Sequence, residues 1–197
     1  SITLTNTVNK QGENMEVFDR FVFNKGLLYP GAIKPNSIQL KNKKMLLHER
    51  DGFNMNRIRK IAKLHPNSIW DPEKADYGSL VDSIMLGFTY VTIDGWIDVS
   101  KLKISHALCK SAITKFTLNK SIEKTIGRLN DLKNEIQRPV LIIGSEPGDI
   151  QQFFDKISPK LAKFYDWYIA PSSSNEILSN SHIKIIGWCK SSQGVII

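Results

Sequence analysis

The sequence is poor in cysteine and has no long hydrophobic segment, and each absence excludes a class of protein. Its two cysteines, Cys109 and Cys189, cannot form the disulfide framework of a small secreted domain or the four-ligand set of a structural zinc site. No apolar run approaches the ~20 residues that span a bilayer, and residues 1–18 lack the basic end and apolar centre of a signal peptide. We therefore expect an intracellular protein with no transmembrane segment.

Motifs for hydrolytic or metal chemistry are also absent. The four histidines, at positions 48, 65, 106 and 182, show no metal-ligand spacing, so each is expected to be a surface or core residue. There is no Walker loop, Gly-x-Ser-x-Gly elbow or nuclease-like carboxylate cluster. Asp94 and Asp98 are close in sequence and could serve a metal or acid/base role, but turn formation at Asp94-Gly95 explains Asp94 equally well.

Positive charge is abundant. The chain of 197 residues has a formal net charge of +8 and a pI near 9.4, which favours RNA, DNA or an acidic membrane surface as a partner. Much of this charge lies between residues 41 and 63. The candidate phosphate contacts in that segment are Lys41, Lys43, Lys44, Arg57, Arg59, Lys60 and Lys63. A solvated helix and loop face is the alternative interpretation of the same run.

The first half of the chain, residues 1–104, is predicted to be a basic region of mixed α/β structure. Residues 16–40 are typical of short strands broken by Gly and Pro turn signals. Helices are predicted at about 54–64 and 78–87, with a turn-rich surface connection between them. The segment 88–102 predicts a β-hairpin around Asp94-Gly95.

The second half, residues 105–197, predicts alternating helices and strands. Residues 105–116 can form a helix, and 121–137 carry an apolar stripe at helical spacing after Ser121 as N-cap. Strands at 140–143, 166–170 and 182–188 alternate with helices that follow Gly148, Ser158 and Ser174. This order predicts a Rossmann-like βαβαβ module with a parallel sheet, following the strand-rich N-terminal part.

The stretch VLIIGSEPGDIQQFF runs an apolar strand into a glycine turn and then a helix. It resembles the first cofactor motif of the viral cap ribose 2′-O-methyltransferases, especially the poxvirus-like members, and the similarity extends over residues 120–190. The resemblance implies a Rossmann-type fold that binds S-adenosylmethionine, with Gly144, Ser145, Pro147 and Gly148 lining the methionine side. A tight structural corner is the alternative interpretation of this turn.

The chain departs from that family in two respects. The acidic residue expected after the second strand, which would hold the cofactor ribose, is replaced by Ser and Asn in APSSSN. The family uses a catalytic Lys, Asp, Lys and Glu, and the resemblance implies that the upstream Lys is Lys101, Lys103, Lys110 or Lys115. The other three lie beyond the third strand, so a partner polypeptide is expected to supply them, or the fold is kept without catalysis. We therefore expect little or no cofactor binding and no activity of the chain alone.

The leading functional hypothesis from sequence is a basic RNA-associated protein with a methyltransferase-like fold, from a viral-type RNA-processing or replication apparatus. The alternative is a non-enzymatic viral structural or assembly protein, of the matrix or nucleocapsid kind, that binds anionic membrane or nucleic acid. Either would lie in the cytoplasm of a host cell or in a virion.

Overall fold

The structure is a computed structural model that describes residues 15–50, 52, 54–173, 176, 178 and 183–190. Its strands are β1 (Glu16–Asn24), β2 (Leu27–Tyr29), β3 (Met45–Glu49), β4 (Ile69–Asp71), β5 (Tyr90–Asp94), β6 (Ala112–Thr117), β7 (Pro139–Ile143), β8 (Asp166–Ala170) and β9 (Ile185–Lys190). Its helices are η1 (Ile38–Leu40), α1 (Met55–Leu64), α2 (Tyr77–Met85), α3 (Val99–Leu108), α4 (Ile122–Asp131), α5 (Asp149–Lys156) and α6 (Pro159–Phe164).

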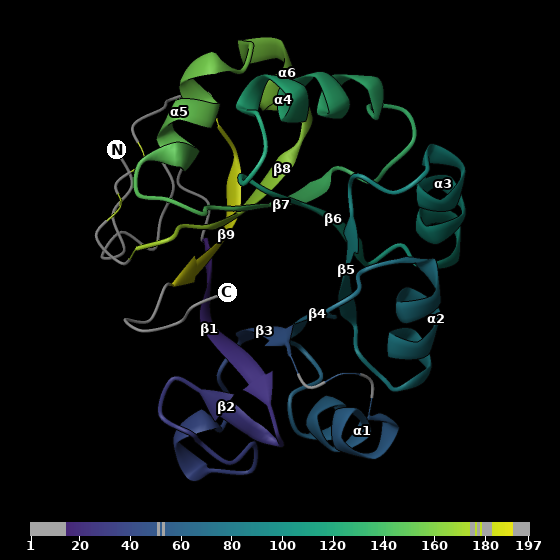
Figure 1. Ribbon diagram of the computed structural model, residues 1–197, viewed down its shortest axis with the longest axis vertical. Helices are drawn as coiled ribbons and strands as arrows, with labels where there is room; N and C mark the ends of the chain where they lie inside the picture. Colours follow the sequence, from purple (N-terminus) through teal and green to yellow (C-terminus); the bar gives the residue numbers. More distant parts are fainter. Residues whose placement is uncertain are drawn as a thin grey trace.

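Eight parallel strands close into a barrel. Each of β1, β3, β4, β5, β6, β7 and β8 pairs in parallel with the next, and β9 returns to pair in parallel with β1. The short β2 is antiparallel to β1 and is added outside this ring. Figure 1 looks into the ring of strands, with helices α1 to α6 around its outside. The architecture is a (β/α)8-type, TIM-like barrel.

The closed barrel overturns the predicted fold class, a strand-rich N-terminal part followed by a Rossmann-like module. The α/β class is correct, because strands and helices do alternate, but the same alternation produces an open or a closed sheet. Closure depends on the pairing of β1 with β9, which begins at Glu16 and Gly187. These two strands are far apart in the chain. Strands from both sides of residue 105 belong to this one sheet, since β5 pairs with β6.

Several local predictions are confirmed. α1 begins after Asn54, whose side chain accepts a hydrogen bond from the backbone N–H of Arg57. α4 begins after the predicted N-cap Ser121, and Ser158 caps α6 with Pro159 in its first turn.

Three other local predictions are wrong. Residues 105–116 are not a helix, since α3 ends at Leu108 and β6 follows. The predicted hairpin at Asp94-Gly95 is instead the end of β5 and the approach to α3. The supposed surface connection before α2 contains β4, which is fully buried. The predicted helix after Ser174 falls largely outside the described residues.

Two hydrophobic clusters fill the molecule. One consists only of strand residues, among them Phe18, Leu46, Ile113 and Leu141, and packs the inside of the barrel. The other joins the outward side chains of the strands to the helices around them. Because successive strand residues point to opposite faces, the eight barrel strands contribute to both clusters, whereas β2 contributes only to the outer one.

No helix in the described parts of the chain has the length and apolar character needed to cross a lipid bilayer.

Candidate active site

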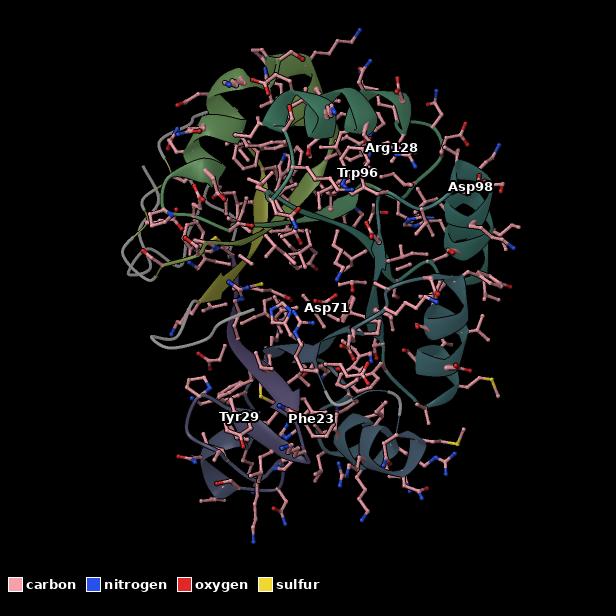
Figure 2. All side chains as sticks on the ribbon, in the orientation of Figure 1. Phe23, Tyr29, Asp71, Trp96, Asp98 and Arg128 are labelled. Atoms are coloured by element: carbon pink, nitrogen blue, oxygen red, sulfur yellow. The ribbon has the colours of Figure 1, made fainter. Side chains whose placement is uncertain are left out.

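Polar side chains collect inside the barrel toward the carboxyl ends of five neighbouring strands. In β1, β3, β4 and β6, each lies two residues after an apolar side chain of the inner cluster, so it points to the same face one layer higher. The five residues, one on each of β1, β3, β4, β5 and β6 in that order, are Arg20, His48, Asp71, Thr92 and Lys115. Figure 2 shows Asp71 near the centre of the ring of strands.

His48 links Arg20 to Asp71 through both ring nitrogens. Its Nδ1 lies 2.6 Å from Asp71 Oδ2, and its Nε2 lies 3.2 Å from Arg20 Nε. Because a carboxylate only accepts and a guanidinium only donates, the ring carries its proton on Nδ1 and accepts on Nε2. Arg20 also donates from Nη1 to the carbonyl oxygen of Pro171, 2.9 Å away. The imidazole is therefore neutral and fixed in one tautomer.

Asp71 joins this chain to Lys115. Lys115 Nζ lies 2.6 Å from Asp71 Oδ1, which also accepts from the Thr92 hydroxyl. Burial alone would raise the pKa of Asp71, but the Lys115 ammonium and the hydrogen bond from His48 hold it far below its ordinary value. Asp71 is thus a carboxylate paired with an ammonium.

Burial lowers the pKa of His48 from its ordinary value, against the raising effect of its hydrogen bond to Asp71. His48 and Lys115 both lie within ion-pairing distance of Asp71. We therefore assign the positive charge that pairs with the Asp71 carboxylate to Lys115, and we treat the His48 imidazole as neutral. Arg20, His48 and Asp71 are all almost fully buried. Such a cluster is costly to desolvate, and an apolar core of equal volume is often as stable.

Lys115 is the member of the cluster that reaches open space. Its side chain is 17% exposed and lines a cavity of about 150 Å³. The cavity is also lined by Asp94, Trp96, Thr117, Asn119 and Lys120. Asp94 is the register partner of Lys115 on the adjacent strand β5. A carboxylate, two ammonium groups, an amide and a hydroxyl thus surround one small space.

Trp96 forms part of the cavity wall. Its ring packs edge to face against Phe116 at 5.8 Å, and Lys120 Nζ lies 4.7 Å from its centroid. The indole Nε1 is buried and has no hydrogen-bond partner among the described residues. The Trp96 ring therefore shapes the cavity, and the two ammonium groups that line it suit an anionic ligand.

α4 holds the loop that carries Trp96. Arg128 donates from Nε to the carbonyl oxygen of Gly95 at 2.9 Å and from Nη2 to that of Ile97 at 2.6 Å. These two residues flank Trp96, so one side chain fixes the backbone on both sides of the indole. Trp96 and Arg128 lie next to each other in Figure 2.

Asp94 and Asp98, the two carboxylates considered for a metal or acid/base role, have different surroundings in the structure. Asp94 accepts a hydrogen bond from the backbone N–H of Trp96 and lines the cavity, so it is both a turn residue and a site residue. Asp98 caps α3 by accepting from the backbone N–H and hydroxyl of Ser100. The structure thus brings one of the pair into the candidate site.

The turn predicted to bind S-adenosylmethionine, Gly144, Ser145, Pro147 and Gly148, follows β7 at the same end of the barrel. Gly144 donates from its backbone to the carbonyl oxygen of Ala170 at 2.8 Å. The backbone N–H groups of Ser145 and Glu146 donate to Asp149 Oδ2 at 2.7 and 3.0 Å. The carboxylate of Asp149 thus already accepts the hydrogen bonds of these two backbone donors in the turn.

The two glycines of this turn have structural reasons of their own. Gly148 has φ of +83° and donates to Glu176 Oε1 at 2.6 Å. A Cβ atom on Gly144 would lie 2.9 Å from the Asp149 carboxylate and 3.1 Å from the backbone nitrogen of Ser172. These contacts are those of a tight corner, and cofactor binding at the turn stays a prediction.

The predicted phosphate contacts divide into two groups. Arg57, Lys60 and Lys63 lie on one side of α1 and line a groove of about 630 Å³, together with Lys34. We call this the lateral groove; it lies between residues 25–40 and α1. Arg59 is on the same helix but does not line it.

The other basic residues of the run lie elsewhere. Lys43 pairs with Asp19 at 3.5 Å and Lys44 with Glu16 at 3.0 Å, while Lys41 is an exposed residue at the end of η1. The seven residues therefore do not form one surface, and RNA or membrane binding by them stays a prediction.

The sequence interpretation missed the central cluster. His48 was expected to be an isolated surface or core residue and Asp71 to lie in a surface connection. Lys115 was expected to lie on a helix, as one of four candidates for the upstream lysine of the methyltransferase family. The available signal was an apolar residue followed two positions later by a polar one, as in Ile69 and Asp71 or Ile113 and Lys115. That pattern is typical of a strand whose inward-facing side chains change from apolar core residues to polar site residues along its length.

In the parts of the chain that the structure describes, no three His, Cys, Asp or Glu side chains are grouped as a metal site. No protein-family model matches the sequence, and no curated protein matches it significantly.

Proposed function

We propose that this protein is an enzyme that transfers a proton at the carbon next to a carbonyl group, in a small substrate that carries a carboxylate or a phosphate. The observation that carries the proposal is the ion pair between buried Asp71 and Lys115, which presents an ammonium group to the cavity. Enzymes with this barrel work at the carboxyl ends of its strands, and the cavity is at that end.

Lys115 is the residue suited to stabilise an oxyanion. The carbonyl oxygen of the substrate gains negative charge when the neighbouring C–H bond breaks, and a positioned ammonium lowers the energy of that state. Asp71 holds the ammonium in place, and His48 and Arg20 hold Asp71. Lys115 is therefore a catalytic residue, and Asp71, His48 and Arg20 behind it are positioning residues.

Asp94 is the candidate base. It lines the same cavity and lies opposite Lys115 in the strand register. In the proposed step the Asp94 carboxylate takes the proton of the C–H bond, and the bonding electrons form the enolate whose oxygen faces Lys115. Return of a proton to the same carbon restores the carbonyl compound with that hydrogen exchanged, and no oxidant or other reactant is needed.

The anionic group of the substrate has its own set of donors. Lys120 and the Asn119 amide line the cavity beside Lys115. These groups can bind carboxylate or phosphate oxygens by charge-assisted hydrogen bonds. A cavity of about 150 Å³ limits the substrate to a few carbon atoms.

Pairing with Asp71 favours noncovalent use of Lys115 over an imine. Imine formation requires the free amine, whereas the carboxylate at 2.6 Å stabilises the ammonium. Borohydride reduction in the presence of pyruvate should therefore add no mass to the protein.

The binding test uses 2-phosphoglycolate, which imitates an enediolate that carries a phosphate. Calorimetry should detect binding to the wild type, and Lys115→Met should weaken it by about tenfold or more because a charge-assisted contact is lost. Lys124→Met, a change on the exposed face of α4, is the matched control and should bind as the wild type does. Equal affinity of the Lys115→Met variant and the wild type, with both folded by circular dichroism, would overturn the proposal.

A further inference from the structure

The first β/α unit of the barrel is irregular. Between β1 and β3 the chain forms the short strand β2 and the single turn η1, where the later units described in full have α-helices. α1 therefore has no helix beside it on that side, and the lateral groove of about 630 Å³ lies there instead. The lower part of Figure 1 shows α1 and the β2 segment on either side of this place.

The floor of the lateral groove is apolar. Phe23, Leu27, Pro35 and Leu64 line it, and Leu64 is 47% exposed although it is a large aliphatic side chain. Phe23 is only 2% exposed, so its ring closes the bottom of the groove and offers little face for stacking. The groove therefore suits an aliphatic chain better than a nucleobase.

The rim of the lateral groove is basic. Lys34, Arg57, Lys60 and Lys63 line it, and no acidic residue is among its lining residues. Arg57, Lys60 and Leu64 lie three and four positions apart on α1, so one helix face presents both the charges and an apolar contact.

Both ends of the lateral groove are defined by contacts across it. At one end the Arg57 Nε approaches Gly26, since a Cβ atom there would lie 3.9 Å from it. At the other end His65 Nε2 lies 2.7 Å from the carbonyl oxygen of Pro35, which ties the end of α1 to the opposite wall. The groove thus has a bounded length and volume, in the range of small-ligand sites.

We propose that the lateral groove binds a single anionic amphiphile, an aliphatic chain with a phosphate or carboxylate head. The chain would lie over Phe23, Leu27 and Leu64, and the head would meet Lys34, Lys60 and Lys63. Burial of the aliphatic chain on the apolar floor and pairing of its head with the basic rim favour the same ligand. Neither interaction alone explains why the groove has both apolar and basic lining residues.

The test compares four ligands by calorimetry, each amphiphile below its micelle-forming concentration. Dodecyl phosphate should bind, while inorganic phosphate and dodecyl maltoside should each bind at least about tenfold more weakly, because each provides only one of the two interactions. A twelve-nucleotide single-stranded RNA should bind no better than phosphate.

Variants of α1 locate the ligand. Lys60→Gln with Lys63→Gln should weaken binding of dodecyl phosphate about tenfold, and Leu64→Asn should weaken it without changing its salt dependence. Arg59→Gln removes a charge from the same helix outside the groove and should leave the affinity unchanged.

Three results would overturn the assignment. Equal effects of the Arg59 and the Lys60 and Lys63 changes would mean that only net charge matters. Tighter binding of the RNA than of dodecyl phosphate would identify a nucleic-acid surface. Binding to phosphatidylglycerol vesicles without binding of the monomeric amphiphile would identify a membrane surface.

Discussion

At the scale of single residues, His48 and Lys115 differ in what surrounds them, although both belong to the central cluster. His48 is enclosed, with both ring nitrogens engaged, so it can only position its neighbours. Lys115 is partly exposed beside a carboxylate, an amide and a second ammonium group. Chemistry is therefore expected at Lys115, and orientation at His48.

A second histidine, His106, makes stability depend on pH. It is a buried residue of α3, and its Nε2 lies 2.7 Å from the hydroxyl of Thr114 on β6. Its Nδ1 faces the backbone N–H of Gln137, so it must accept and the ring must be neutral. Burial lowers the pKa of His106 from 6.5 to about 4.

Because the folded pKa of His106 is lowered, the unfolded chain binds this proton more readily than the folded one. Above about pH 6.5 the ring is neutral in both states, and this group does not reduce the stability of the fold. As the pH falls toward 4, the unfolded chain takes up the proton first, so the free energy of unfolding decreases. Between pH 7 and pH 5 the free energy of unfolding should fall by about 2 kcal/mol from this group. Urea titrations should show that His106→Gln removes about that part of the decrease.

The remaining decrease should come from other groups, His48 among them, whose pKa is lowered in the same direction. An identical pH dependence in His106→Gln and the wild type would show that His106 is not held neutral by the fold.

At the scale of elements, α4 controls the wall of the candidate site. It is an amphipathic helix whose buried Thr125 and Leu129 face the barrel, and its Arg128 reaches the carbonyl oxygens of Gly95 and Ile97. The loop after β5 thus owes its position to α4, which comes three elements later in the chain.

Changing Arg128 should therefore affect ligand affinity more than folding. Arg128→Met removes two hydrogen bonds from a charged donor, which should loosen Trp96 and weaken 2-phosphoglycolate binding several-fold. Arg128→Lys can restore one of the two bonds and should recover part of the affinity. Calorimetry measures the affinity, and urea titration measures the stability of the same variants.

A purely structural role would give the opposite result. In that case Arg128→Met would lower the free energy of unfolding and leave the affinity of the folded protein for the probe unchanged.

At the scale of the whole molecule, the sequence predicts the individual helices better than the way they are assembled. α1, α4 and α5 follow from apolar spacing and from capping residues such as Asn54 and Ser121, which act within a few residues. Closure of the barrel rests on the pairing of β1 with β9, and no local pattern reports a contact between segments so far apart.

The candidate site was hidden for a related reason. β4 has three residues and lies among Pro and Gly turn signals, so the sequence pattern predicts a loop at Asp71, which is in fact buried. β6 follows α3 after three residues, and the two were merged into one predicted helix that placed Lys115 wrongly. Only the barrel brings the side chains of β1, β3, β4, β5 and β6 to one point.

The most direct measurement of the central claim is proton exchange at carbon. The wild type would be incubated in deuterium oxide with pyruvate or dihydroxyacetone phosphate, and the C–H signals next to the carbonyl followed by proton NMR. Proton transfer to Asp94 with the enolate held by Lys115 predicts loss of these signals faster than in buffer for at least one compound, and predicts the buffer rate for Lys115→Met and Asp94→Asn. Exchange at the buffer rate with the wild type, or equal exchange by the wild type and Lys115→Met, would contradict the account.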